Sequence, residues 1–154
     1  KVIKLKVEQE FASDVHNPQI LIGLIGKVQE GKVDALAKRI NGVLSYKSKV
    51  RKATDEVGRV AIVTGGGFLP EFVQEAKNRG VNTYITGIIT PNSSDYDKKN
   101  YAKKLSEINK MGINVIGCSH YLTEKWAMEF SIPYFSEICK SEFIEDKEAL
   151  NLLE

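Results

Sequence analysis

The chain has 154 residues, of which 42% are hydrophobic, and this is enough to bury a core and to form one compact domain. Its 22 basic and 20 acidic residues nearly cancel, and the net charge of +2 gives no indication of nucleic-acid or membrane binding. No apolar run reaches the length of a membrane span, and no signal-peptide pattern opens the chain. The two cysteines, Cys118 and Cys139, are too few for a disulfide framework; they allow a single bridge, but we expect reduced thiols in a cytoplasmic protein.

The first half of the chain has an irregular pattern. Apolar residues and lysines alternate over residues 1–8, which predicts an edge strand shielded by charge. Residues 19–28 form a second, strongly apolar run. The apolar positions of residues 33–44 fit a helix, and the basic stretch at 47–52 is expected on a solvated strand or loop.

From residue 58 onward a strand–helix pattern occurs three times. Short β-branched runs predict strands, and apolar stripes bounded by proline and glycine predict helices, at residues 59–63, 70–79, 81–85, about 97–111, 113–116 and from near 120 onward. Such a succession predicts an α/β fold of the three-layer type, with a parallel or mixed sheet between helices.

The last predicted helix opens with a histidine and a glutamate four residues apart. Positions i and i+4 share a helix face, so His120 and Glu124 are predicted to point at the same spot. An imidazole and a carboxylate placed that way form a natural pair of metal ligands, although surface or capping roles fit these residues as well. Two ligands alone do not complete a metal site.

In an open parallel sheet, ligands bind beyond the carboxyl ends of the strands. We therefore expect the glycine run at 65–67, the Thr86-Gly87 pair and the Ser119-His120 pair to converge on one edge. The glycine run fits either a tight strand-to-helix turn or a loop that binds an anion at a helix N-terminus. It lacks the lysine and Ser/Thr of a P-loop. The candidate anion-binding residues are Gly65, Gly66, Gly67 and Thr86.

Two further residues have both a functional and a structural interpretation. His16 is either a metal ligand or a polar loop residue, and Cys118 is either a thiolate ligand or nucleophile, or a buried residue that ends a strand. Pro133 is predicted to kink or divide the last helix. The aromatic residues predicted to form the core of that helix are Trp126, Phe130, Tyr134 and Phe135.

The segments 60–67, 83–87 and 120–124 resemble, in order and spacing, the three signature blocks of one family. That family is the dinuclear-metal Ngg-interacting-factor-three-like proteins, often labelled GTP cyclohydrolase 1 type 2 homologues. Residues 23–27 resemble the turn that opens the family's connecting region, and residues 142–146 resemble its closing strand. The resemblance runs from about residue 20 to the end of the chain.

The resemblance implies that His120 and Glu124 bind a pair of divalent metal ions, for which Zn, Mn and Fe are equally suitable. The family takes its other ligands from an N-terminal lobe that holds a His-His pair, and this chain has no His-His pair. Its residues 14–18 are similar to the family's Asp-Ala-His-Pro loop, which implies that Asp14 is a ligand. The chain departs from the family at Ile88, where an acidic residue is usual, and at Ser119, where glycine is usual.

The resemblance also implies that residues 1–154 are a single α/β domain, the C-terminal part of a two-lobed protein that forms a homo-oligomeric ring, commonly a hexamer. For function it implies metal-dependent hydrolysis of phosphate esters or nucleotides. The cyclohydrolase label has no support in the residues, since nothing in them indicates a purine pocket. The missing His-His pair and Ile88 favour an alternative, a non-catalytic interaction or assembly module that binds protein partners.

Overall fold

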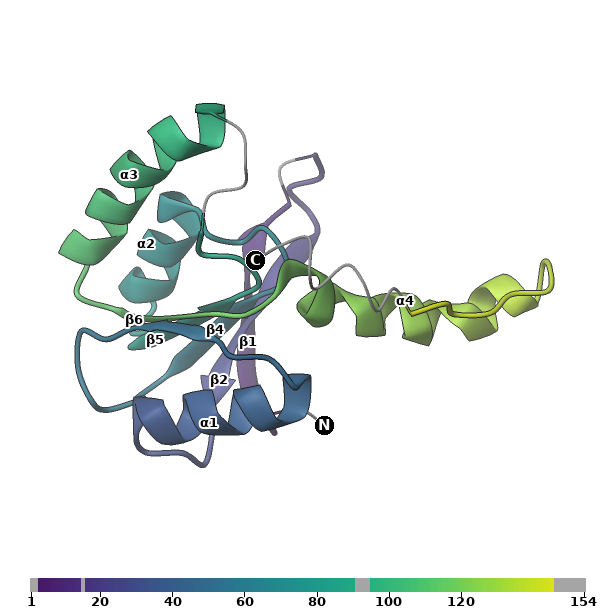
Figure 1. Cartoon of the computed structure of the whole chain (residues 1–154), viewed down its shortest axis with the longest axis horizontal. Coiled ribbons are helices and arrows are strands. Elements are labelled where there is room, and N and C mark those ends of the chain that lie inside the picture. The colour runs from purple at the N-terminus through teal and green to yellow at the C-terminus, as the bar shows by residue number, and fades with distance from the viewer. Residues whose placement is uncertain (1–2, 15, 91–94, 146–154) are drawn as a thin grey trace.

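A six-stranded mixed sheet forms the middle layer of the protein, in the order β1-β2-β4-β5-β6-β3 (Figure 1). The computed structural model describes residues 3–14, 16–90 and 95–145. Three neighbouring strands are parallel: β4 (Val60–Val63), β5 (Thr83–Thr86) and β6 (Asn114–Gly117). The other three pair antiparallel with their neighbours: β1 (Lys6–Ser13), β2 (Leu21–Lys27) and β3 (Lys49–Arg51).

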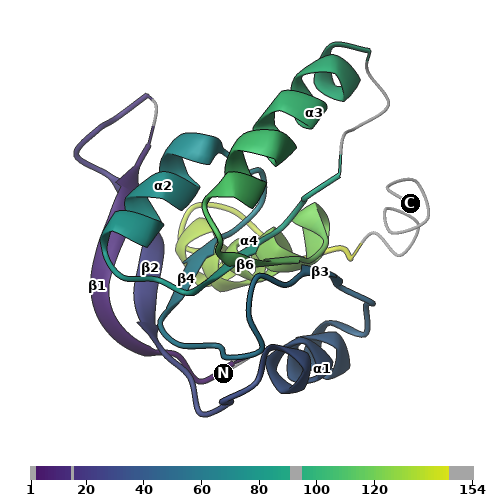
Figure 2. The same cartoon turned by 90° about the vertical axis from the view of Figure 1, so that its left-hand side faces the viewer.

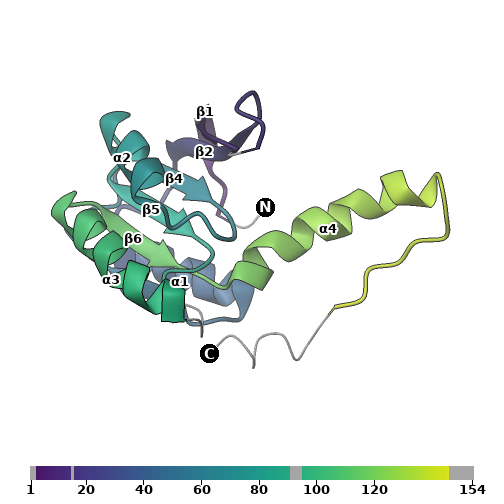
Figure 3. The ribbon, with the colours of Figure 1, turned by 90° about the horizontal axis from the view of Figure 1, so that it is seen from above.

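Helices cover both faces of this sheet. The helices α2 (Pro70–Asn78) and α3 (Asp95–Lys110) lie on one face, and α1 (Val33–Leu44) lies on the other (Figure 2). The helix α4 (His120–Ser136) begins at the end of β6 and then runs away from the sheet (Figures 1 and 3). The predicted three-layer α/β fold is therefore confirmed. Within the described ranges, no helix is long and apolar enough to cross a membrane.

Each face of the sheet has its own apolar core. Along β4 the side chains alternate, so Ala61 and Val63 pack with the α2 residue Phe72, whereas Val60 packs with the α1 residue Leu36. Because the parallel strands are covered on both sides, every residue of β5 and β6 is buried. The central strands are therefore held rigidly from both sides, and their ends have fixed positions.

The antiparallel hairpin of β1 and β2 forms one edge of the sheet. As predicted, β1 is an edge strand, although it spans residues 6–13 rather than 1–8. The interpretation of residues 23–27 as a turn is wrong, because they lie inside β2. Gly26 is needed there for close packing, since a Cβ at this position would lie 2.1 Å from the carbonyl oxygen of Lys6.

The helix α4 differs from its prediction. It continues through Pro133 without division, because the fixed φ of proline is compatible with a helix and the missing N–H removes only one hydrogen bond, the one to the carbonyl of Glu129. Its aromatic side chains were predicted to be core, but Phe130, Tyr134 and Phe135 are 77%, 74% and 51% exposed. Of the four aromatic residues predicted to be core, only Trp126 packs against it. The reason is that the helix leaves the body after its first turns, so its apolar side chains have nothing beneath them.

The closing strand suggested by the resemblance is absent from residues 142–145, and Asp146 lies outside the described residues. A strand needs a free sheet edge to pair with. Instead, the chain turns back beside α4 (Figure 3), and Glu145 forms an ion pair with Lys125.

Candidate functional site

The carboxyl ends of the three parallel strands meet at one edge of the sheet, as predicted. The register places Thr86 of β5 beside Gly117 of β6. In the loops beyond, the carbonyl of Gly65 accepts a hydrogen bond from the N–H of Ile88 at 3.1 Å, and the N–H of Gly65 donates to the Thr123 hydroxyl at 3.1 Å. Gly65 therefore joins the loop after β4, the loop after β5 and the first turn of α4.

His120 and Glu124 lie side by side on α4, as their spacing predicted. Nε2 of His120 is 3.1 Å from Oε2 of Glu124, and the two side chains are 44% and 49% exposed. Both side chains lie over Gly65, where a Cβ would come within 1.8 Å of Oε1 of Glu124 and 2.9 Å of Nε2 of His120. The φ of Gly65 is +58°, which also favours glycine. Glycine at position 65 thus makes room for the pair.

The first turn of α4 is stabilised by contacts within the helix terminus and by the packing of Leu122 on the body. Ser119 is the N-cap, and its Oγ accepts a hydrogen bond from the N–H of Leu122 at 3.3 Å. Leu122 is buried in the core beneath α1. The hydroxyl of Thr123 lies 2.9 Å from the carbonyl oxygen of His120, on the same turn. These contacts fix the backbone position from which the His120 side chain projects.

The glycine run has a packing explanation at two of its three positions. A Cβ on Gly67 would lie 2.5 Å from Cγ1 of Val63, and the Gly67 carbonyl accepts a hydrogen bond from the buried Tyr84 hydroxyl at 2.6 Å. Burial holds the pKa of Tyr84 far above its usual value, so this hydroxyl remains a donor. Gly66 is exposed, and the nearest atom to a Cβ there is Cε1 of His120 at 3.8 Å. Close packing explains Gly65 and Gly67, whereas Gly66 borders open space.

Thr86 is buried at the end of β5, and its hydroxyl has no hydrogen-bond partner among the described residues. It shares a strand face with Tyr84, two residues earlier, so it points toward α2. The first turn of α4, which carries the candidate ligands, packs through Leu122 on the opposite face of the sheet, next to α1. Thr86 therefore points away from the face on which α4 packs, and its role in anion binding stays a prediction.

Asp14 lies at the same edge of the sheet, in the turn from β1 to β2. Its Oδ1 accepts hydrogen bonds from the N–H groups of His16 and Asn17 at 2.8 Å and 2.9 Å, and these bonds lower the pKa of the Asp14 carboxyl. In the part of the chain that the structure describes, no three His, Cys, Asp or Glu residues gather into a possible metal site. Asp14 thus does not join the pair on α4, and its role as a ligand stays a prediction.

Cys118 is buried directly before α4, and burial raises the pKa of its thiol to about 12. This agrees with the structural interpretation of the residue, because a protonated thiol is neither a good nucleophile nor a metal ligand. Cys139 is exposed, and neither cysteine is in a disulfide.

Thr123 is the site residue that the sequence did not single out. Its only signal was a hydroxyl in the first turn of a helix, which usually serves that helix alone.

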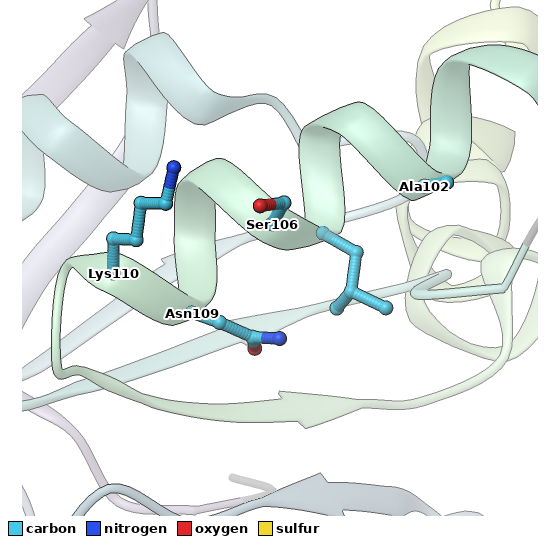
Figure 4. A pocket seen from close by; sticks show the side chains of 5 residues that line it. Ala102, Ser106, Asn109 and Lys110 are labelled. Atoms are coloured by element: carbon cyan, nitrogen blue, oxygen red, sulfur yellow. The ribbon is translucent and has the colours of Figure 1, made fainter.

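A separate pocket of about 460 Å³ lies along α3 (Figure 4) and is distinct from the predicted site residues. It is lined by Ala102, Leu105, Ser106, Asn109 and Lys110.

Comparison with solved structures finds the same fold in longer proteins. The protein ybgI, described as of unknown function, has a TM-score of 0.61 and 22% identity, over 86% of this chain and 47% of its own. A Bacillus cereus protein related to NIF3 has a TM-score of 0.56 and 22% identity, over 81% of this chain and 34% of its own. Reduced HcgD from Methanocaldococcus jannaschii has a TM-score of 0.57 and 15% identity, over 86% of this chain and 48% of its own.

At these identities the similarity concerns the fold alone, and the chain spans about half the length of these proteins or less. No match was found among curated proteins. A sequence model of the family Duf34/NIF3 (NGG1p interacting factor 3) matches residues 1–145, nearly the whole chain. The chain belongs to the Duf34/NIF3 family.

Proposed function

We propose that the chain binds a divalent metal ion through Nε2 of His120 and a carboxylate oxygen of Glu124. The observation that carries this proposal is the 3.1 Å approach of the two groups on one helix face. The donor set fits such an ion, because one imidazole nitrogen and one carboxylate lie together over Gly65, which has no side chain to separate them. A mixed set of this kind suits Zn, Mn or Fe. With two protein ligands such binding would be weak.

For a protein in which further ligands complete the centre, we propose metal-dependent hydrolysis of a phosphate ester or nucleotide. A bound ion there supplies Lewis acidity toward a phosphoryl oxygen. The chain's own residues orient the site, since the Gly65–Thr123 hydrogen bond holds the glycine loop against the helix α4 that carries His120 and Glu124. It also contributes space, because the exposed Gly66 leaves the side of the His120 imidazole open to a substrate anion.

A second candidate is a non-catalytic interaction or assembly module. Two observations favour it. Among the described residues, no third His, Cys, Asp or Glu gathers with His120 and Glu124 into a possible metal site. In addition, Ile88, whose N–H is hydrogen-bonded to the Gly65 carbonyl, is apolar at a position where the family resemblance implies an acidic residue. In this interpretation the metal site is vestigial, and protein partners bind elsewhere on the chain.

The metal proposal is tested by titrating the 154-residue chain with Zn²⁺ and Mn²⁺ in a calorimeter. We expect one weak site, and we expect His120→Ala to weaken it by at least about tenfold, a typical effect of disturbing a metal site. The matched control is His16→Ala, which removes an exposed histidine from the β1–β2 turn and leaves the affinity unchanged. Binding that survives His120→Ala but falls in His16→Ala would overturn the assignment.

The two candidate functions are separated by a hydrolysis screen with phosphate esters and nucleotides in the presence of Mn²⁺ or Zn²⁺. Turnover that is lost in both His120→Ala and Glu124→Gln supports the hydrolase. Metal found by elemental analysis without any turnover supports the interaction module.

We also propose the setting in which the chain acts: a cytoplasmic homo-oligomer, of the ring type that the resemblance implies, in which residues 1–154 correspond to the C-terminal part of a two-lobed protein. The proposal that the chain corresponds to part of a longer protein is supported by its coverage of 47% and 48% of the lengths of ybgI and HcgD, whereas the ring rests on the family resemblance. The coding sequence upstream of Lys1 tests this, since we expect it to encode a strand with a His-His pair.

A further inference from the structure

The short strand β3 lies at an edge of the sheet. It stands last in the strand order, at the opposite edge from β1 (Figure 2), and it pairs with β6. On β6, the N–H groups of Asn114 and Cys118 donate hydrogen bonds toward β5, both at 2.9 Å. Because backbone groups alternate in direction along a strand, those of Val115 and Gly117 face β3 instead.

This alternation determines which backbone groups of β3 are free. Arg51 and Lys49 lie directly opposite these two residues of β6 and exchange backbone hydrogen bonds with them. The N–H and C=O of Val50, between them, therefore point out of the sheet, and neither is bonded to any residue that the structure describes. Unpaired backbone groups on a sheet edge are a template for a further strand.

The side chains along this edge are basic. Residues 47–52 contain no acidic residue. Their basic residues are Lys47, Lys49, Arg51 and Lys52. Lys52 is paired with two carboxylates on the α1 side. Arg51 donates a hydrogen bond to the Tyr101 hydroxyl at 3.1 Å, and among the described residues it has no carboxylate partner. The edge thus carries positive charge that the described part of the chain does not neutralise.

We propose that β3 binds an extended acidic segment of a partner protein, which adds a strand to the sheet beside Val50. In this mode of recognition the backbone hydrogen bonds give affinity and the alternating side chains give specificity. The segment has about six residues, because residues 47–52 span about 20 Å at roughly 3.3 Å per residue. This proposal does not depend on metal binding.

The register predicts the sequence pattern of the bound segment. Arg51 contacts α3, so Arg51 and Lys49 lie on the face of the sheet that α3 covers, whereas Val50 packs on the α1 side. Residues directly opposite each other in neighbouring strands share a face. The edge therefore matches an acid–apolar–acid alternation, with carboxylates opposite the two basic residues and a β-branched side chain opposite Val50.

The same charges argue against other occupants. Lysines on an edge strand commonly prevent unwanted strand pairing. Here they repel another basic edge, including β3 of a second copy, but attract carboxylates. The opposite edge strand, β1, mixes Lys6 with Glu8 and Glu10, so it lacks this preference. A nucleic acid has the matching charge, but its backbone does not continue a β-ladder.

Fluorescence anisotropy of the full 154-residue chain with a labelled peptide, in which glutamate alternates with valine, tests the proposal. We expect binding that weakens as the salt concentration rises. We expect Lys49→Glu to raise the Kd at least about fivefold, because it places like charges opposite each other. The matched control is Lys6→Glu, which makes the same charge change at an exposed site on the opposite edge strand and should leave the Kd unchanged.

The backbone contact needs its own test, because charge alone also attracts an acidic peptide. Val50→Pro removes the outward N–H and leaves the pairing of β3 with β6 intact, since proline is tolerated where the N–H of an edge strand faces solvent. We expect this variant to raise the Kd at least about fivefold. The same peptide with a fully N-methylated backbone keeps its charge and should bind more weakly by a similar factor. Circular dichroism checks that each variant is folded.

Hydrogen exchange measured by NMR locates the contact. In the free chain the Val50 amide should exchange rapidly, and the peptide should slow its exchange. A Val50 amide that is already protected in the free chain overturns the proposal, because the edge is then paired without the peptide. Equal binding of the N-methylated peptide, or an equal loss of affinity in Lys6→Glu, also overturns it. So does tighter binding of single-stranded DNA than of the peptide, which indicates a site for charge alone.

Discussion

The backbone N–H of Gly65 donates a hydrogen bond to the hydroxyl of Thr123 at 3.1 Å. The bond joins the loop after β4 to the first turn of α4, two segments that lie 58 residues apart in the sequence. Within α4, the same hydroxyl faces the carbonyl oxygens of Ser119 and His120 at 3.0 Å and 2.9 Å. One threonine thus fixes the position of the glycine loop relative to the candidate ligands.

Removing this hydroxyl should loosen the loop. Thr123→Val keeps the shape of the side chain but leaves the Gly65 N–H without its partner, so we expect the free energy of unfolding to fall by about 1–2 kcal/mol. Thr123→Ser retains the hydroxyl and should lose much less. Urea denaturation measures both values. Equal stability of the valine variant and the original chain would show that the hydrogen bond contributes nothing.

The packing of the candidate ligands against Gly65 predicts a difference between two glycine substitutions. Gly65 and Gly112 both have a positive φ, +58° and +62°, but a Cβ on Gly112 meets nothing within 4 Å, whereas a Cβ on Gly65 would clash with Glu124. Gly112→Ala should cost about 1–2 kcal/mol through the backbone conformation alone. Gly65→Ala should cost about 1–3 kcal/mol more through overpacking.

The same pair of variants separates stability from site geometry. In calorimetry, Gly65→Ala should abolish metal binding by displacing Glu124, and Gly112→Ala should leave the affinity as it was. Equal losses of stability in the two variants would contradict the contact between Gly65 and Glu124.

The turn from β1 to β2 should weaken in acid. Hydrogen bonds from His16 and Asn17 lower the pKa of Asp14 in the folded protein. Its contribution to stability is therefore fully present above the unfolded pKa, about 3.9, and is lost as the pH falls through the lowered folded pKa. Asp14→Asn keeps an oxygen acceptor but does not titrate. The stability of this variant should show a smaller slope between about pH 4 and pH 2, and equal slopes would contradict the prediction.

The two cysteines should differ in reactivity. Cys139 is exposed, whereas burial raises the pKa of Cys118 to about 12, so Cys118 has almost no thiolate at neutral pH. Iodoacetamide should modify Cys139 alone in the native chain and both residues in urea. Peptide mass spectrometry identifies the modified residue. Modification of Cys118 at the same rate as Cys139 would show that the core beneath α1 opens readily.

Local patterns were sufficient to predict much of the fold and one part of the site. The spacing of His120 and Glu124 predicted that they share a helix face, since the helix period depends on no other part of the chain. The order of strands and helices from residue 58 predicted that three strand ends meet at one edge. Both predictions rest on regularities within single elements or between consecutive ones.

What the sequence did not predict depends on contacts between distant segments. The exposure of Phe130 and Tyr134 depends on whether the body extends beneath α4, and the periodicity of a helix carries no information about that. The Gly65–Thr123 hydrogen bond depends on the packing of the first turn of α4 against the β4 loop. Residues 142–145 form no strand because a strand exists only beside a partner, whatever its own composition.

The candidate ligands and the exposed aromatic side chains belong to one continuous helix, so the proposed metal site and an exposed apolar surface share one element. His120 and Glu124 occupy the first two turns of α4, and the exposed aromatic side chains occupy the turns that follow. A partner that displaced this helix would also displace Glu124, which lies against Gly65. Thermodynamic reciprocity then requires that a cation bound at His120 and Glu124 alter the partner's affinity by the same factor by which the partner alters the cation's.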